Sequence, residues 1–158
     1  MALVELEDLR LADRFPRGVD RALRKAGWSP GRQVDTTQWR DAIDGIDMHP
    51  AAEAFLAEFG GLLVDVHGIG RTAAKEPFEL DPELCAGEEG RFREWSEFLG
   101  RSLYPLGELD HGRFFLGIDE SGTLYLVIDW LAVFDGSADA GLIALCQGTM
   151  PRELSSGA

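Results

Sequence analysis

The chain has 158 residues and a mass of 17.4 kDa, which suits one domain with its own hydrophobic core. It holds 15 basic and 28 acidic residues, and this formal net charge of −13 argues against nucleic acid and anionic membrane as direct partners, because both attract basic surfaces. No apolar run is long enough to cross a bilayer, and the first 15 residues lack a basic start, so we expect no signal peptide and a cytoplasmic location.

Three amphipathic helices are predicted in the first 60 residues. The first begins at Pro16 and ends at Gly27, the second carries Trp39 on its apolar face, and the third begins at Pro50. In each helix apolar residues recur at i, i+3 and i+4, which places them on one face. This repeated pattern predicts a helical layer that covers one face of a sheet.

The chain changes from helical to strand spacing at Gly60 and Gly61. Leu62, Val64 and Val66 then alternate with Leu63 and Asp65, as in a half-buried strand. We expect Gly60 to take the left-handed conformation that ends a helix, and Gly61 to let the backbone turn into the strand. Such a corner sets how the helical layer lies on the sheet.

The rest of the chain is predicted to be mainly β structure. Its expected elements are a flexible turn at residues 67–71, a short edge strand at 76–81, a helix at 91–103, strands at 104–109, 114–118, 123–128 and 131–134, and a last helix between Ser137 and Gly148. The edge position follows from Pro77 and the alternating acids, which discourage further pairing. The turn superficially resembles the start of a phosphate-binding loop, but it lacks the third glycine and the Gly-Lys-Ser/Thr sequence.

Acidic charge is concentrated in the second half. Residues 1–50 hold 8 basic and 9 acidic side chains, whereas residues 76–139 hold four arginines and 15 acids, a net charge of −11. This segment either faces a basic partner or forms a solvated surface that keeps the protein soluble.

Several stretches, taken in order, resemble one known family. They are residues 23–32, residues 54–62 with the glycine pair, residues 103–107 and residues 115–125. Together with Trp39, they resemble the SUKH superfamily of bacterial immunity proteins, most closely its third subfamily. The resemblance implies an α+β fold with a curved, mostly antiparallel sheet of about five or six strands backed by helices. It also implies a protein without catalytic activity that binds and neutralises a toxin domain, often a nuclease or nucleic-acid deaminase, and it assigns no contact residue.

The resemblance covers a single domain at residues 16–150. It leaves residues 1–15 as an N-terminal extension and residues 151–158 as a tail, which we expect to be disordered because it is polar and terminal. Cys85 and Cys146 lie far apart and outside any zinc-binding spacing, so two free thiols are expected. The three histidines are scattered, and we predict neither a metal nor a cofactor.

The leading hypothesis is an immunity protein that blocks a basic cognate toxin domain of a polymorphic toxin system by shape and charge. The predicted contacts are acids in turns or at strand ends, namely Glu108, Asp110, Asp119, Glu120, Asp129 and Asp135. One alternative is a regulatory interaction module without a toxin. A more distant one is a small-molecule enzyme using His67, His111, Asp110, Asp119, Glu120 and Ser121. The enzyme hypothesis lacks a G-x-S-x-G, H-E-x-x-H or cysteine–histidine signature.

Overall fold

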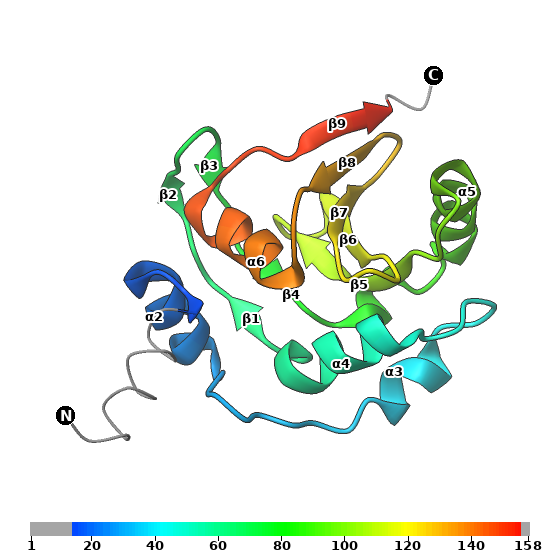
Figure 1. The fold of residues 1–158 in the computed structure, drawn as a ribbon, viewed down its shortest axis with the longest axis horizontal. Coiled ribbons are helices and arrows are strands. Elements are labelled where there is room, and N and C mark those ends of the chain that lie inside the picture. Colours follow the sequence, from blue (N-terminus) through cyan, green and yellow to red (C-terminus); the bar gives the residue numbers. More distant parts are fainter. Residues whose placement is uncertain (1–13, 156–158) are drawn as a thin grey trace.

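The protein is an α+β structure in which helices cover both faces of a curved, open antiparallel sheet (Figure 1). The computed structural model describes residues 14–155. Of the predicted N-terminal extension, residues 1–13 therefore lie outside the described residues. Phe15 lies inside and is buried in the core, so the ordered domain begins at least one residue before the predicted boundary.

In this part of the chain the regular elements before residue 60 are helices, and strands are the more numerous elements after it. In chain order the elements are α2 (Arg17–Ala26), α3 (Thr37–Ala42), α4 (Pro50–Phe59), β1 (Leu63–Val64), β2 (Gly68–Ile69), β3 (Ala74–Lys75), β4 (Phe78–Glu79), the 3₁₀ helix η1 (Pro82–Cys85), α5 (Glu89–Leu99), β5 (Tyr104–Leu109), β6 (Phe114–Ile118), β7 (Leu124–Val127), β8 (Leu131–Phe134), α6 (Ala138–Gln147) and β9 (Arg152–Ser155). Within residues 14–155 no helix has the length and apolar character needed to cross a membrane.

The helix ends follow the capping residues of the sequence. The His49 ring accepts a hydrogen bond from the Ala52 N–H at the start of α4, and the Ser137 hydroxyl accepts one from the Ala140 N–H at the start of α6. The predicted bounds of the helices next to Gly27 and Gly148 are confirmed, because both glycines are left-handed there. The helix predicted at residues 91–103 ends earlier, since Gly100 is left-handed with a φ of 68°.

At the helix-to-strand corner the left-handed glycine is Gly61, whereas the sequence predicts Gly60. Gly60 has an extended backbone (φ −61°, ψ 141°), whereas Gly61 has a φ of +85°. Gly60 is needed for space, because a Cβ there would collide with the Trp39 ring and the Leu56 carbonyl oxygen. The prediction that Gly60 is left-handed is therefore wrong, although the corner itself is where the sequence places it.

Seven strands form the main sheet, in the order β1-β4-β5-β6-β7-β8-β9 and all antiparallel. The predicted strand near residues 76–81 is not an edge, because β4 pairs with β1 on one side and with β5 on the other. The predicted disorder of the C-terminal tail is wrong for residues 152–155, which form the edge strand β9 along β8. The additional strand β9 raises the number of strands in the main sheet to seven, above the predicted five or six.

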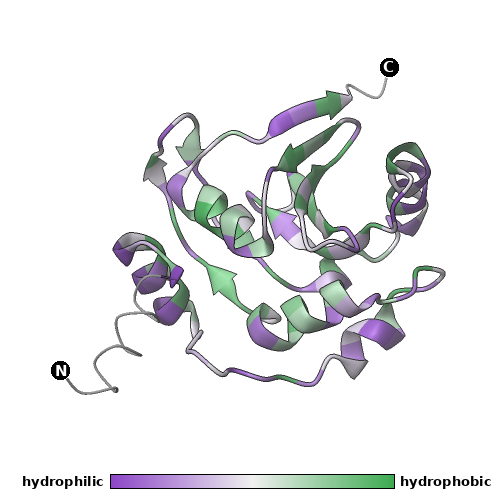
Figure 2. Cartoon of the chain, viewed as in Figure 1, coloured by the Kyte–Doolittle hydropathy of each residue, from purple (hydrophilic) through white to green (hydrophobic). Residues whose placement is uncertain are grey.

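Each face of the sheet has its own hydrophobic core. Along β7, Leu124 and Leu126 pack with α2, α4 and α6, while Tyr125 and Val127 pack with η1 and α5. The sequence predicts a helical layer on one face, and the structure adds α5 on the other. Figure 2 shows the result as hydrophobic residues along β8 and hydrophilic residues over much of α2 and α3.

The segment after β1 forms a small hairpin instead of the predicted flexible turn. Its strands β2 and β3 pair through Gly68 with Lys75 and Ile69 with Ala74. The connection is held against the C-terminal end of α6, because backbone N–H groups of residues 71–73 donate to the carbonyl oxygens of Gln147 and Gly148. The hairpin thereby becomes a wall beside the sheet.

Candidate partner-binding surface

The six acids predicted as partner contacts lie at two opposite ends of the sheet. The antiparallel strand pairing sets this arrangement. The β5–β6 and β7–β8 turns lie at one end of the sheet, whereas the β6–β7 turn and the end of β8 lie at the other. The Asp110 end carries Glu108, Asp110 and Asp129. The Glu120 end carries Asp119, Glu120 and Asp135. A single flat contact cannot use all six.

Asp119 is buried and serves the turn in which it lies. Its side chain is 0% exposed, and Oδ1 accepts hydrogen bonds from Ser121 N (2.8 Å), Ser121 Oγ (2.6 Å) and Thr123 N (3.1 Å). Oδ2 accepts one from the Tyr125 hydroxyl at 2.7 Å and faces Arg101 Nη1 at 3.3 Å. Burial by itself raises the pKa of the Asp119 carboxyl, but these hydrogen bonds outweigh it and lower the pKa. The predicted contact role of Asp119 does not fit this position.

Most of the other predicted acids already have partners. Asp110 pairs with Arg113 (3.4 Å), Asp129 with Arg91 (3.3 Å), and Asp135 with Arg152 (2.8 Å). Glu120 Oε1 accepts a hydrogen bond from the Ser102 N–H at 2.7 Å. These contacts involve exposed side chains and are weak enough for a partner's basic group to compete with them. Of these ion pairs, only that of Asp135 brings in a charge from outside residues 76–139, because Arg91 and Arg113 are already counted in the net charge of −11.

Glu79 and Glu108 lie directly opposite each other across β4 and β5. Opposite residues of an antiparallel pair project from the same face, and like charges at such positions repel. Within residues 14–155 neither carboxylate forms an ion pair or a side-chain hydrogen bond. The sequence does not reveal Glu79 as a candidate, because its role depends on the register in which β4 pairs with β5. A basic group of a partner would relieve this repulsion.

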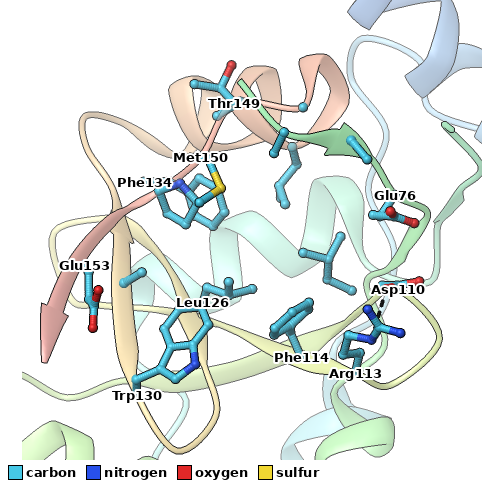
Figure 3. A pocket seen from close by; sticks show the side chains of 18 residues that line it. Glu76, Asp110, Arg113, Phe114, Leu126, Trp130, Phe134, Thr149, Met150 and Glu153 are labelled. Carbon is cyan, nitrogen blue, oxygen red and sulfur yellow. Dashed lines mark ion pairs between the residues drawn. The ribbon is translucent and has the colours of Figure 1, made fainter. Parts of the chain in front are cut away.

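An apolar hollow lies beside the Asp110 end, on the sheet face that carries α6. Its volume is about 450 Å³ (Figure 3). Large apolar side chains line it, including Phe114, Leu126, Trp130, Phe134, Leu145 and Met150. The floor comes from alternate residues of β6, β7 and β8, whereas the upper wall comes from the end of α6 and the residues that follow it.

Hydrogen bonds hold the walls of the hollow in place. The hairpin connection is bonded to the end of α6, and the Met150 N–H donates to the Thr72 hydroxyl at 2.7 Å. The rings of Phe114 and Trp130 lie 6.0 Å apart, which joins the ends of two neighbouring turns. The hollow is therefore formed in the unbound chain.

Two carboxylates without partners flank the hollow. Glu76 and Glu153 lie on opposite sides of it in Figure 3, and the ion pair of Asp110 and Arg113, within the β5–β6 turn, lies on the same side as Glu76. Within the described part of the chain neither glutamate forms an ion pair or a side-chain hydrogen bond. Sequence reasoning misses Glu153 because it lies in the predicted disordered tail. It misses Glu76 because its neighbourhood depends on how the hairpin docks on α6.

A comparison with known protein families identifies the family of this chain. The sequence model of the SUKH-3 immunity protein family matches residues 15–148. The chain belongs to this family. The resemblance noted from the sequence to the third SUKH subfamily is thereby confirmed, and membership indicates a toxin-immunity function, in which the protein binds a toxin as an inhibitor. Neither the curated proteins nor the solved structures contained a match.

The residues of the alternative enzyme hypothesis do not converge in this SUKH-3 immunity protein. His111 is in the β5–β6 turn and Ser121 in the β6–β7 turn, at opposite ends of the sheet. His67 is next to β2, where its ring faces Asp65 at 3.6 Å on an exposed surface. The Ser121 hydroxyl donates to Asp119, so it satisfies a buried carboxylate. The hydrogen bond between Ser121 and Asp119 therefore stabilises the β6–β7 turn.

Both cysteines are buried free thiols. Burial raises the pKa of Cys146 to about 12, and it raises the pKa of Cys85 strongly as well. Both side chains therefore stay protonated near neutral pH and pack as small hydrophobic groups.

Proposed function

We propose that this SUKH-3 immunity protein neutralises a cognate toxin domain in the bacterial cytoplasm by covering a basic, nucleic-acid-handling surface of that toxin. The toxin class we infer is a nuclease or nucleic-acid deaminase of a polymorphic toxin system. The observation that carries this proposal is the directly opposed pair Glu79 and Glu108, whose carboxylates lack a cationic partner within the described residues. A lysine or arginine of a toxin would neutralise both.

The physical logic is competition for a basic surface. An enzyme that acts on nucleic acid binds phosphates with lysine and arginine side chains, so its substrate surface is positively charged. An acidic inhibitor is steered to that surface over a distance and then excludes the substrate by its bulk. The net charge of −13 supplies the long-range attraction, and the acids at the ends of the sheet supply the contacts.

The candidate contact residues are the exposed and half-buried acids of the two turn ends, of which a single flat contact uses one end. They are Glu108, Asp110 and Asp129 at one end and Glu120 and Asp135 at the other. Asp119 is left out because it is fully buried. Glu79 is added because it shares the sheet face and the charge of Glu108.

The test is rescue of a toxin-expressing cell. The small C-terminal domain of a large secreted protein encoded beside this chain is expressed in bacteria with and without the chain, and growth is followed. We expect growth only in the presence of the chain, together with a stable complex of the two purified proteins. Loss of growth despite folded, abundant chain would overturn the proposal. A matched control is Glu53→Lys on the exposed side of α4, which changes the net charge outside the two turn ends and should still protect.

A further inference from the structure

We propose that the apolar hollow receives an anchor side chain of the toxin, an aromatic or large aliphatic residue that stands between lysines or arginines. This inference rests on the proposed function and names the segment that the immunity protein recognises. It commits the contact to the Asp110 end of the sheet, where the hollow opens. The Glu120 end then faces away from the bound segment.

The lining of the hollow fits an apolar side chain. Phe114 and Trp130 are only partly buried, and Met150 is 64% exposed at the mouth. Exposed apolar groups that converge on one concavity are characteristic of binding sites. A volume of about 450 Å³ accommodates a large side chain together with part of its backbone. An anchor of this kind in a central pocket contributes much of the affinity of a protein interface.

Charge at the mouth defines the neighbours of the anchor. Glu76 and Glu153 lie on opposite sides of the hollow and form no ion pair within the described residues, whereas the nearby Asp110 is neutralised by Arg113. The mouth therefore has an excess of two negative charges around an apolar centre. Residues on both sides of a bound anchor would meet these carboxylates, which favours lysine or arginine at those positions.

The hollow is preformed in the chain without a partner. Its hairpin wall is bonded to the end of α6, and Met150 is bonded through its N–H to Thr72. A preformed site loses little conformational entropy on binding, so more of the contact energy appears as affinity. A side chain on a basic segment fits better than a free small molecule, because the polar groups flank the mouth as carboxylates and few lie inside.

The first experiment measures binding of the purified toxin domain to four variants. Ala144→Phe fills the hollow from α6, and Met150→Lys places a cation at its mouth, so each should weaken binding by ~10-fold or more. The controls are Ala144→Ser, which leaves the hollow open, and Ala54→Lys, which places a cation on the exposed side of α4. Both should bind within about twofold of the original chain. Equal affinity of all four variants, with equal thermal stability, overturns this inference while the chain itself still neutralises the toxin.

The second experiment needs no toxin. Random peptides displayed on phage are selected on the purified chain and then tested on Ala144→Phe. We expect selected peptides to carry an aromatic or large aliphatic residue beside lysine or arginine, and to lose binding to Ala144→Phe. No selection, or peptides that bind both proteins equally, overturns the inference. Selection of such peptides by a chain that fails to bind its toxin overturns the proposed function alone.

Discussion

The Asp119 carboxylate shows, at the scale of one residue, that an acid in a hairpin turn can be wholly internal. Five hydrogen-bonding or charged contacts, from Ser121, Thr123, Tyr125 and Arg101, surround its two oxygens. Tyr125 packs in the core on the α5 side while its hydroxyl donates to Asp119, and burial together with this hydrogen bond raises the pKa of Tyr125. The turn and the second core are therefore connected through one carboxylate.

Replacing this carboxylate should destabilise the fold. Asp119→Asn presents an amide N–H₂ to donors, so we expect the free energy of unfolding at neutral pH to fall by about 2–4 kcal/mol. Urea denaturation measures this change. Asp129→Asn is the matched control, because its side chain is 92% exposed and its ion pair contributes at most about 1 kcal/mol. Equal losses in the two variants would contradict the internal role of Asp119.

The same residue predicts how stability depends on pH. The pKa of Asp119 is lower in the folded protein than the value of about 3.9 in an unfolded chain. Its ionised form therefore stabilises the fold at every pH above the unfolded value, and this contribution is lost as the pH falls through the folded pKa. We expect the original chain to lose stability in acid partly because Asp119 becomes protonated. Asp119→Asn has no carboxylate at this position, so its stability should lack this part of the pH dependence. Identical slopes of stability against pH below about 4 would show the prediction wrong.

Gly60 and Gly61 are required for different reasons, and substitutions should separate them. A Cβ at Gly60 collides with Trp39 and Leu56, so Gly60→Ala should cost about 2–3 kcal/mol, and Gly60→Val more. Gly61→Ala has space but must keep a φ of +85°, which costs about 1–2 kcal/mol. Thermal unfolding compares the variants. Toxin binding per folded molecule should remain unchanged, and a stable Gly60 variant that no longer binds would contradict the structural role of the corner.

At the scale of an element, the edge strand β9 completes the sheet and covers part of the core on the α5 side. Its residues pair with β8, and Leu154 packs against the core formed with α5. Arg152 binds both oxygens of Asp135 at 2.8 and 2.9 Å, which fixes the start of the strand. Glu153 of the same strand borders the hollow. The tail thus contributes to the fold and to the proposed binding site.

Removing β9 should destabilise the whole domain. A chain that ends at Pro151 leaves β8 as an apolar edge and uncovers part of the second core, so we expect the midpoint of thermal unfolding to fall by about 5–10 °C. An exposed apolar edge also favours aggregation, which size-exclusion chromatography detects. Arg152→Ala is the control, because it removes only a surface ion pair and should shift the midpoint by about 3 °C or less. An unchanged midpoint after truncation would mean that β9 contributes nothing to stability.

At the scale of the whole molecule, the two acidic ends can be distinguished by charge reversal. Glu108→Lys with Asp129→Lys alters the Asp110 end, while Glu120→Lys with Asp135→Lys alters the other end and changes the net charge equally. We expect the first pair to slow association with the toxin by about 10-fold or more at low salt and the second to slow it much less. Added salt should reduce the difference, because it screens surface charge. Unchanged association rates in both pairs would remove the electrostatic part of the proposed function.

Local patterns in the sequence predicted the parts of the fold that depend on neighbouring residues. Apolar spacing and capping residues placed α2, α4 and α6, and strand alternation with Gly122 in the turn placed β6 and β7. The family resemblance, carried by the order of these same local features, is confirmed over residues 15–148. Each of these signals arises within one helix or one hairpin, so no knowledge of distant contacts is needed.

Only the tertiary structure decided which distant segments meet. The pairing of β4 with β5 sets Glu79 opposite Glu108, and the docking of the hairpin on α6 creates the hollow. The burial of Asp119 depends on Tyr125 and Arg101, which reach it from outside the turn. Strand register and docking are set by the joint burial of apolar faces far apart in the chain, and no short window of sequence contains that information. The amino-acid sequence by itself thus determined the family, the helices and the β6–β7 hairpin, whereas the placement of the acids and the hollow came from long-range packing.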